Sequence, residues 1–400
     1  MRKTYVLSLV LFICFPILTG CWSKKELDEL AVATALGIDK VDDQYYVSVQ
    51  LLNPGEIASK VPSQRAPVFV HTVKADTIFE ALRKLTTLAS RKIYLSHIRI
   101  IILGEGLAKK GISKPLDFLS RDHEMRTDFF VAIARNHTAK EILSVLTPME
   151  KISANQIFTS VEMSEKNWAP TKGVNLDELI NSLVSQGKNP VLTGISLHES
   201  NEIDSSMENV ARVDPKTEIK LAALGVFKRD RLIGWLTQEE SKGFNYITSN
   251  IHSTVGSYPC EDQKNERITV EVIKSKAELI GKVKNGVPSM TVKVKLEENI
   301  GEVQCELDLS KTSTIDYLEK KAEKEVKDII DTSIKRAQED FQSDIFGFGE
   351  VIHREDPKAW KTLKHDWDNH FSEMEVNIIV DAKIRRLGTI TESFQKEAKK

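Results

Sequence analysis

The chain has 400 residues, of which 41% are hydrophobic and 28% are charged, with 56 lysines and arginines against 58 aspartates and glutamates. This apolar content excludes a wholly disordered chain, and the single long apolar run, at the very start, excludes a multi-span membrane protein. The balanced charge gives none of the basic excess that is typical of nucleic acid binding.

The first twenty residues have the pattern of a secretory signal. Two basic residues precede an apolar run from Tyr5 to Leu18, which is shorter than the roughly 20 residues that a membrane-spanning helix needs. Leu18-Thr19-Gly20-Cys21 then has the form of a bacterial lipobox. We therefore expect residues 1–20 to be a lipoprotein signal peptide and Cys21 to carry diacylglyceryl and N-acyl groups, which together anchor a protein stably. The alternative is an ordinary secretory signal followed by a chance cysteine.

Loss of the signal changes the charge of the protein. Removal of Arg2 and Lys3 leaves 54 basic residues against the same 58 acidic residues, a net charge near −4. An anionic membrane surface does not attract a mildly acidic protein, so the lipid must supply the anchoring.

Residues 21–200 predict an N-terminal α/β-type domain. Ser23 and Glu26 fit a capping box before Leu27, Leu30, Ala31 and Thr34, which follow at helical spacing. Strands and helices then alternate, which favours a mixed sheet with helices packed on it. The expected strands span residues 45–52, 68–73, 97–103, 129–134 and 190–197, and the expected helices residues 77–90, 116–120, 139–146 and 176–184. A polar loop at 201–214 is the expected domain boundary.

Residues 215–395 predict a C-terminal α+β domain. It opens with a hairpin of Lys220–Phe227 and Leu232–Leu236, and its longest element is a helix at about 315–345 with one apolar stripe. The other expected elements are a helix at 239–244, strands at 268–273, 277–284 and 289–297, a helix at 359–371 and a strand at 375–384. The whole chain is therefore expected to be a multi-domain α+β protein with mixed or antiparallel sheets and packed helices.

The sequence has no constellation that is typical of catalysis. It contains no Gly-x-Ser-x-Gly elbow, Walker loop or His-Glu-x-x-His pair. His365 and His370 lie roughly 140° apart on a helix, which indicates surface residues. A cation site at Asp39, Asp42 and Asp43 lacks the glutamate of an EF-hand. We expect no enzyme activity, no metal and no cofactor.

Glycine, tryptophan and cysteine positions have structural interpretations. Gly347-Phe348-Gly349 follows a helix, which indicates that the helix ends in a sharp turn. Trp360 and Trp367 are spaced to pack one helix face. Cys260 and Cys305 are the thiols left besides Cys21, and outside the cytoplasm they are free to pair or to stay reduced. A bridge across 45 residues would stabilise the fold by about 4 kcal/mol.

Three segments together resemble the Ger(x)C spore germination lipoproteins, the C subunits of nutrient germinant receptors. The first runs from Cys21-Trp22-Ser23 through Glu26-Leu27 to Gly37-Ile38-Asp39, with Ser23 where the family often has an acidic residue. The second is the hairpin from Gly225-Val226-Phe227 to Gly234, and the third is Asp344-Ile345-Phe346-Gly347-Phe348-Gly349 followed by His353, Trp360 and Trp367. The resemblance spans nearly the whole mature chain.

This resemblance implies a lipid-anchored protein on the outer face of the spore inner membrane. It would assemble with an A subunit and a multi-span B subunit, and the complex would respond to nutrients by releasing ions and dipicolinate. The motif residues become interaction candidates: Trp22, Glu26, Leu27, Gly37, Asp39, Gly225, Phe227, Gly234, Asp344, Phe346, Gly347 and Gly349. Three segments are candidates for the surface that meets the partner subunits: the helix at 315–345, the hairpin at 226–236 and the turn at Phe346–Phe348. For each of them, packing in the core is the alternative interpretation. The alternative function is an extracytoplasmic solute-binding lipoprotein of a transporter, with an interdomain pocket.

Overall fold

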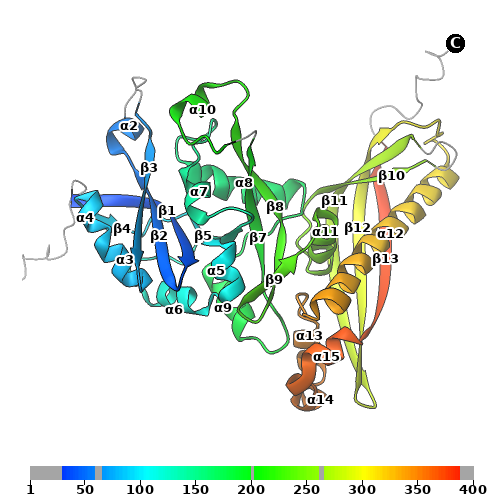
Figure 1. Ribbon diagram of the computed structural model, residues 1–400. Helices are drawn as coiled ribbons and strands as arrows, with labels where there is room; N and C mark the ends of the chain where they lie inside the picture. Colours follow the sequence, from blue (N-terminus) through cyan, green and yellow to red (C-terminus); the bar gives the residue numbers. More distant parts are fainter. Residues whose placement is uncertain (1–28, 59–64, 200–201, 261–264, 388–400) are drawn as a thin grey trace, which may run out of the picture.

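A computed structural model describes residues 29–58, 65–199, 202–260 and 265–387 (Figure 1). The expected fold class is confirmed, because helices and strands are mixed and the strands form two separate sheets. The larger sheet comes from the first part of the chain, and the smaller sheet lies beside it with the long helix packed along it. The signal region, Cys21, Trp22, Ser23, Glu26 and Leu27 lie outside the described residues.

The larger sheet is mixed. Its strands are β1 (Leu30–Val41), β2 (Gln44–Leu52), β3 (Val68–Ala75), β4 (Lys92–Tyr94), β5 (Ile100–Gly104), β6 (Phe130–Ala134), β7 (Val191–Glu199), β8 (Thr217–Lys228) and β9 (Arg231–Trp235). They are ordered β3-β2-β1-β5-β6-β7-β8-β9, and β4 pairs with β1 off this path. The central pairs β1–β5, β5–β6 and β6–β7 are parallel, while the outer pairs β1–β2, β2–β3, β7–β8 and β8–β9 are antiparallel.

Helices cover both faces of the central strands of this sheet. The helices of this part of the chain are α2 (Pro54–Ala58), α3 (Ile78–Lys84), α4 (Thr86–Ala89), α5 (Glu105–Lys110), α6 (Ser113–Arg121), α7 (Ala139–Ser144), α8 (Ser153–Asn167), α9 (Leu176–Val184) and α10 (Met207–Ala211). Residues of α3, α5, α6 and α9 share one core with the sheet, and residues of α7 and α8 share another on the opposite face. Every residue of β5 is therefore buried.

Two sequence predictions in this region are wrong. The residues Leu30, Ala31 and Thr34, expected on a helix, belong to strand β1. The cause is that β1 is buried on both faces along most of its length, so its apolar residues do not alternate and also fit a helical period. The polar stretch after residue 150 contains a helix that we did not expect, the 15-residue α8.

The expected hairpin is present, but it extends the larger sheet instead of opening a new one. β8 pairs with β7 from Val191↔Val226 to Glu199↔Thr217, and β8 and β9 turn at Arg229 and Asp230. The polar loop at 201–214 therefore connects two neighbouring strands of one sheet and includes α10.

The smaller sheet is built on two long strands. Its order is β10 (Thr254–Pro259), β11 (Arg267–Lys284), β12 (Val287–Val303) and β13 (Glu375–Arg386). The expected tight turn joins β11 to β12, with Asn285 and Gly286 at φ of 54° and 81°. The three strands that we expected over 268–297 lie in this pair. Helices α11 (Gln238–Ile247) and α12 (Thr312–Lys335) pack against the sheet in one core.

The long helix is shorter than predicted. After α12 the chain forms a π-helical segment, Arg336–Phe341. The helix ends there because Gln342 adopts a left-handed conformation with φ of 46°. Its predicted stripe is largely buried, including Leu318, Ala322, Val326, Ile330 and Ile334, so core packing accounts for it. An unexpected helix α13 (Phe348–Glu355) follows, and the helix predicted at 359–371 is divided into α14 (Pro357–Leu363), a short 3-10 turn and α15 (Trp367–Ser372).

Candidate functional site: the junction between the two sheets

Asp344 organises the turn that leads into α13. Its carboxylate accepts hydrogen bonds from the backbone N–H groups of residues 346–349, at donor–acceptor distances of 3.1, 2.9, 3.2 and 2.8 Å in chain order. It also accepts one from Nε1 of Trp367 at 3.0 Å. Burial raises the pKa of Asp344 to about 6, while these donors favour the charged form. Asp344 is thus a carboxylate at neutral pH that holds α13 and α15 together.

The glycines of this segment serve close packing. Gly347 has φ of 81° and begins α13, so the turn that we expected at the end of a helix instead starts a new one. A Cβ on Gly349 would approach Gly187 to 2.6 Å and the ring of Trp367 to 2.8 Å. Phe346 and Phe348 are buried beside each other, with ring centroids 5.2 Å apart. These residues are therefore part of the core.

The hairpin and this C-terminal segment meet directly. Oγ of Ser343 donates a hydrogen bond to the carbonyl of Phe227 at 2.8 Å, and the N–H of Asn189 donates to the carbonyl of Asp344 at 2.6 Å. A Cβ on Gly234 would lie 2.5 Å from the ring of Phe341. The second and third sequence motifs thus form one junction between the sheets, through residues 116 positions apart at the contact of Ser343 with Phe227.

Gly225 belongs to the same hairpin but packs within the larger sheet. A Cβ there would lie 2.8 Å from Leu232 and 3.0 Å from the ring of Trp235. At the turn, Nζ of Lys228 is 3.0 Å from the carbonyl of Gln342 and 3.2 Å from the carboxylate of Asp368. These contacts fix the hairpin against the C-terminal helices.

The first motif lies elsewhere. Asp39, in β1, accepts hydrogen bonds from the N–H groups of Ala139 and Lys140 at 2.9 and 3.2 Å, at the start of α7. Burial raises the pKa of Asp39. A Cβ on Gly37 would lie 3.0 Å from Leu143 of the same helix. Gly37 therefore allows α7 to pack closely on the larger sheet, and Asp39 holds the start of α7 by two hydrogen bonds.

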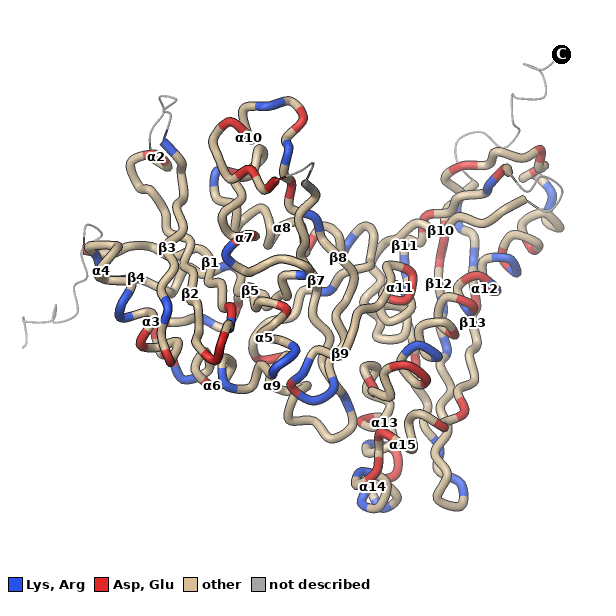
Figure 2. The backbone as a smooth tube through the Cα atoms, in the orientation of Figure 1, with Lys and Arg blue, Asp and Glu red and all other residues tan. Residues whose placement is uncertain are grey.

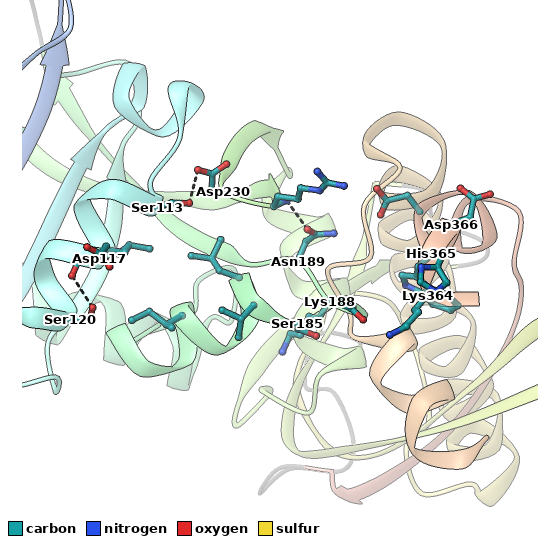
Figure 3. Close-up of a pocket in the computed structure, with 18 residues that line it drawn as sticks. Ser113, Asp117, Ser120, Ser185, Lys188, Asn189, Asp230, Lys364, His365 and Asp366 are labelled. Atoms are coloured by element: carbon teal, nitrogen blue, oxygen red, sulfur yellow. Dashed lines mark hydrogen bonds between the residues drawn. The ribbon is translucent and has the colours of Figure 1, made fainter. Parts of the chain in front are cut away.

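A wide polar cleft borders the junction. It has a volume of about 940 Å³ and lies between α6 and α9 on one side and the Lys364–Asp368 segment on the other (Figure 3). Charges of both signs line it, among them Lys188, Arg229, Asp230 and Asp366. The hairpin turn crosses its floor, where the N–H of Arg229 donates to Oδ1 of Asn189 at 2.7 Å. These lining residues are not identifiable from the sequence, because they come from segments as distant as Ser113 and Asp368.

The other candidate positions have structural partners. Cys260 and Cys305 form a disulfide with Cα atoms 6.4 Å apart, which ties the edge of the smaller sheet to the segment after β12. Trp360 and Trp367 are both buried, in edge contact at 5.1 Å, as expected for one packed face. His365 lines the cleft. The described residues contain no group of three or more His, Cys, Asp or Glu placed to hold a metal ion.

Asp43, part of the proposed cation alternative, is paired with Lys40 at 3.2 Å. Asp39 accepts backbone N–H groups of α7, so Asp39 and Asp43 have separate partners. Among the helices that the structure describes, none has both the length and the apolar content of a membrane span.

Comparisons with known proteins agree along nearly the whole chain. A family model described as "Spore germination protein N-terminal domain" matches residues 23–197, and one described as "Spore germination B3/ GerAC like, C-terminal" matches residues 222–388. The first match ends within β7 and the second begins within β8, two strands that pair with each other.

Individual relatives give the same result. Spore germination protein KC of Bacillus subtilis (strain 168) is 31% identical over 396 residues, covering 97% of each chain. Spore germination protein B3 of the same organism is 26% identical, covering 95% of this chain and 97% of its own. The crystal structure of the GerBC protein has the same fold, with a TM-score of 0.55 and 20% identity over 87% of this chain and 96% of that one. The chain therefore belongs to the Ger(x)C, or GerAC-like, family of spore germination proteins.

Proposed function

We propose that this protein is the lipid-anchored C subunit of a nutrient germinant receptor, on the outer face of the spore inner membrane. It acts as a binding scaffold for the A and B subunits and carries out no catalysis itself. The full-length similarity to spore germination proteins supports the receptor role. The lipobox ending at Cys21 supports the anchor.

The junction is the observation that carries the scaffold role. Within the family motifs, the carbonyl of Phe227 accepts a hydrogen bond from Oγ of Ser343, and the carboxylate of Asp344 accepts backbone N–H groups of its own turn. Beside these residues lies the polar cleft. Walls that carry charges of both signs suit a polypeptide partner, because complementary charges specify its orientation.

The anchor is tested by nutrient germination of spores that carry this receptor alone. Deletion of the gene, or Cys21→Ala, is expected to abolish or strongly impair nutrient-triggered dipicolinate release while vegetative growth stays normal. Cys14→Ala is the matched control, because Cys14 lies inside the signal and is expected to be removed with it. Normal nutrient germination in both the deletion and the Cys21→Ala spores would contradict the proposal.

The second candidate function is an extracytoplasmic solute-binding lipoprotein of a transporter. The cleft between the two parts of the molecule is the observation in its favour. Calorimetry of a chain that starts at Trp22 against amino acids, sugars and nucleosides separates the two. Saturable binding that Arg229→Ala or Lys364→Ala abolishes would favour the transporter role, and absence of binding favours the scaffold.

A further inference from the structure

One carboxylate lies on the otherwise apolar inner face of the smaller sheet. The inward residues of β12 run Met290, Val292, Val294, Leu296, Glu298 and Ile300. Glu298 is 1% exposed, although glutamate is almost never fully buried unless it is paired.

This carboxylate is only partly satisfied. Oε2 of Glu298 has no hydrogen-bond partner among the described residues, and neither has Oη of Tyr258, which is also buried. Burial raises the pKa of Glu298 to about 7, and Glu319 adds to this effect by repulsion. A buried polar atom without a partner destabilises a fold, so its presence calls for a compensating contact.

A cavity of about 260 Å³ adjoins Glu298, between the smaller sheet and the helices α11 and α12. Tyr258 and Val270 lie on the sheet side with Glu298, Tyr246 comes from α11, and Ala322 and Val326 of α12 line the opposite side. At about 30 Å³ for the share of one water molecule in the liquid, the space suits a molecule of about eight non-hydrogen atoms or fewer.

The charges around the cavity favour a cation. Glu239, Glu298 and Glu325 line it, against the ammonium of Lys242. That ammonium is already engaged, because Nζ lies 3.3 Å from the carbonyl of Val255 and 3.5 Å from the ring centroid of Trp168. The two tyrosine rings add faces that attract an organic cation.

We propose that this cavity binds a small organic amine, whose ammonium donates a hydrogen bond to Oε2 of Glu298 while its short hydrocarbon part packs against Val270, Ala322 and Val326. A carboxylate-bearing ligand is disfavoured by the three glutamates. The site is separate from the cleft, and the proposal does not depend on the receptor role.

The probe is n-butylamine, titrated by calorimetry into the mature chain in detergent, with n-butanol as the uncharged analogue of the same shape. We expect saturable binding of the amine, and affinity at least tenfold lower for the alcohol. Glu298→Gln is expected to weaken amine binding at least tenfold. Glu297→Gln is the matched control, because Glu297 is next in the strand but pairs outside the cavity with Arg385.

A second variant tests the site independently, in case Glu298→Gln does not fold. Ala322→Leu fills the cavity and leaves Glu298 in place, and it is expected to block the amine as well. Melting curves establish that each variant is folded. No saturable binding of butylamine to the wild type, equal affinity in Glu298→Gln, or butanol binding as tightly as butylamine would each overturn the proposal.

Discussion

The two sheets of this protein are buried in different ways. The central strands of the larger sheet are covered by helices on both faces, so β5 reads as an unbroken apolar run. The smaller sheet is covered on one face by α11 and α12, and β12 alternates between buried and more exposed residues. Figure 2 accordingly shows acidic and basic residues along α12 and the smaller sheet.

The difference shows where each sheet tolerates charge. In the larger sheet the buried Asp39 accepts two backbone N–H groups from one helix. Beside the smaller sheet Asp344 accepts five donors, from the turn into α13, from α13 itself and from α15, and Glu298 has an oxygen with no partner among the described residues. Substitution of a buried carboxylate near the smaller sheet should therefore change stability more than substitution of Asp39. The change should be a loss at Asp344 and a gain at Glu298.

Asp344→Ala is expected to have the largest effect. It leaves five buried donors unpaired, so the free energy of unfolding should fall by about 5 kcal/mol. Urea unfolding measures the loss, and hydrogen exchange should show it first in α13–α15, not in β5. Asp340→Ala, at an exposed surface pair, is the control and should change stability by less than about 1 kcal/mol. A small effect of Asp344→Ala would refute its role as the organiser of the junction.

Loss of the disulfide comes next. The double change Cys260→Ser and Cys305→Ser is expected to lower the free energy of unfolding by about 4 kcal/mol, because a loop of 45 residues is no longer closed in the unfolded chain. Reduction of the wild type by dithiothreitol should give a similar loss in urea titrations. An unchanged midpoint after complete reduction would mean that the bridge contributes nothing to this sheet.

Glu298→Gln is expected to stabilise the protein, with a definite pH dependence. The folded-state pKa of about 7 lies above the ordinary value of 4.5, so the fold favours the neutral carboxyl over the charged one. The stability that this carboxyl contributes is present below pH 4.5 and is lost as pH rises through 7. The titratable groups that interact with it are Tyr258 from β10, Tyr246 from α11 and Glu319 from α12. At pH 8 the variant should gain up to about 3 kcal/mol.

The difference should become small as pH falls below 4.5, because the carboxyl is then mostly neutral in both the folded and the unfolded chain. Melting curves of the wild type and the variant over pH 4–8 give the comparison. A difference that stays constant over this range would show that ionisation of Glu298 is not the cause.

Asp39→Ala should have the smallest effect of the four. It removes two hydrogen bonds at the start of α7, in the manner of a lost helix cap, and should cost about 1–2 kcal/mol. Chemical denaturation measures the loss, with exposed Asp42→Asn as control, because asparagine tolerates the left-handed conformation of this residue, φ 47°. A loss of stability as large as that of Asp344→Ala would contradict the claim that buried carboxylates matter more near the smaller sheet than in the larger one.

The smaller sheet was the more predictable of the two. Its one-sided burial gives alternation, and Asn285-Gly286 marks the turn, so β11, β12 and β13 are predictable from the sequence, whereas β10 is not. In the larger sheet, the first part of β1 up to Thr34 fits a helical period because two-sided burial removes the alternation. The end of the long helix depended on the left-handed Gln342, for which the apolar stripe gives no signal.

The site was predicted in parts. Asp344, Gly347 and Phe227 were found through the family resemblance, but the contact of Ser343 with Phe227 depends on folding between distant segments. Glu298 was missed because the sequence around it, Glu297-Glu298-Asn299, reads as a polar strand end. Only the register of β12 places it on the inner face.

The central claim is that this chain is the anchored scaffold of a germinant receptor, and isolation of the tagged protein from spore inner membranes tests it most directly. After mild cross-linking, quantitative mass spectrometry should recover its A and B subunits in amounts comparable to the tagged chain. Recovery of a solute transporter instead, with the A and B subunits left in the same membranes, would contradict the claim.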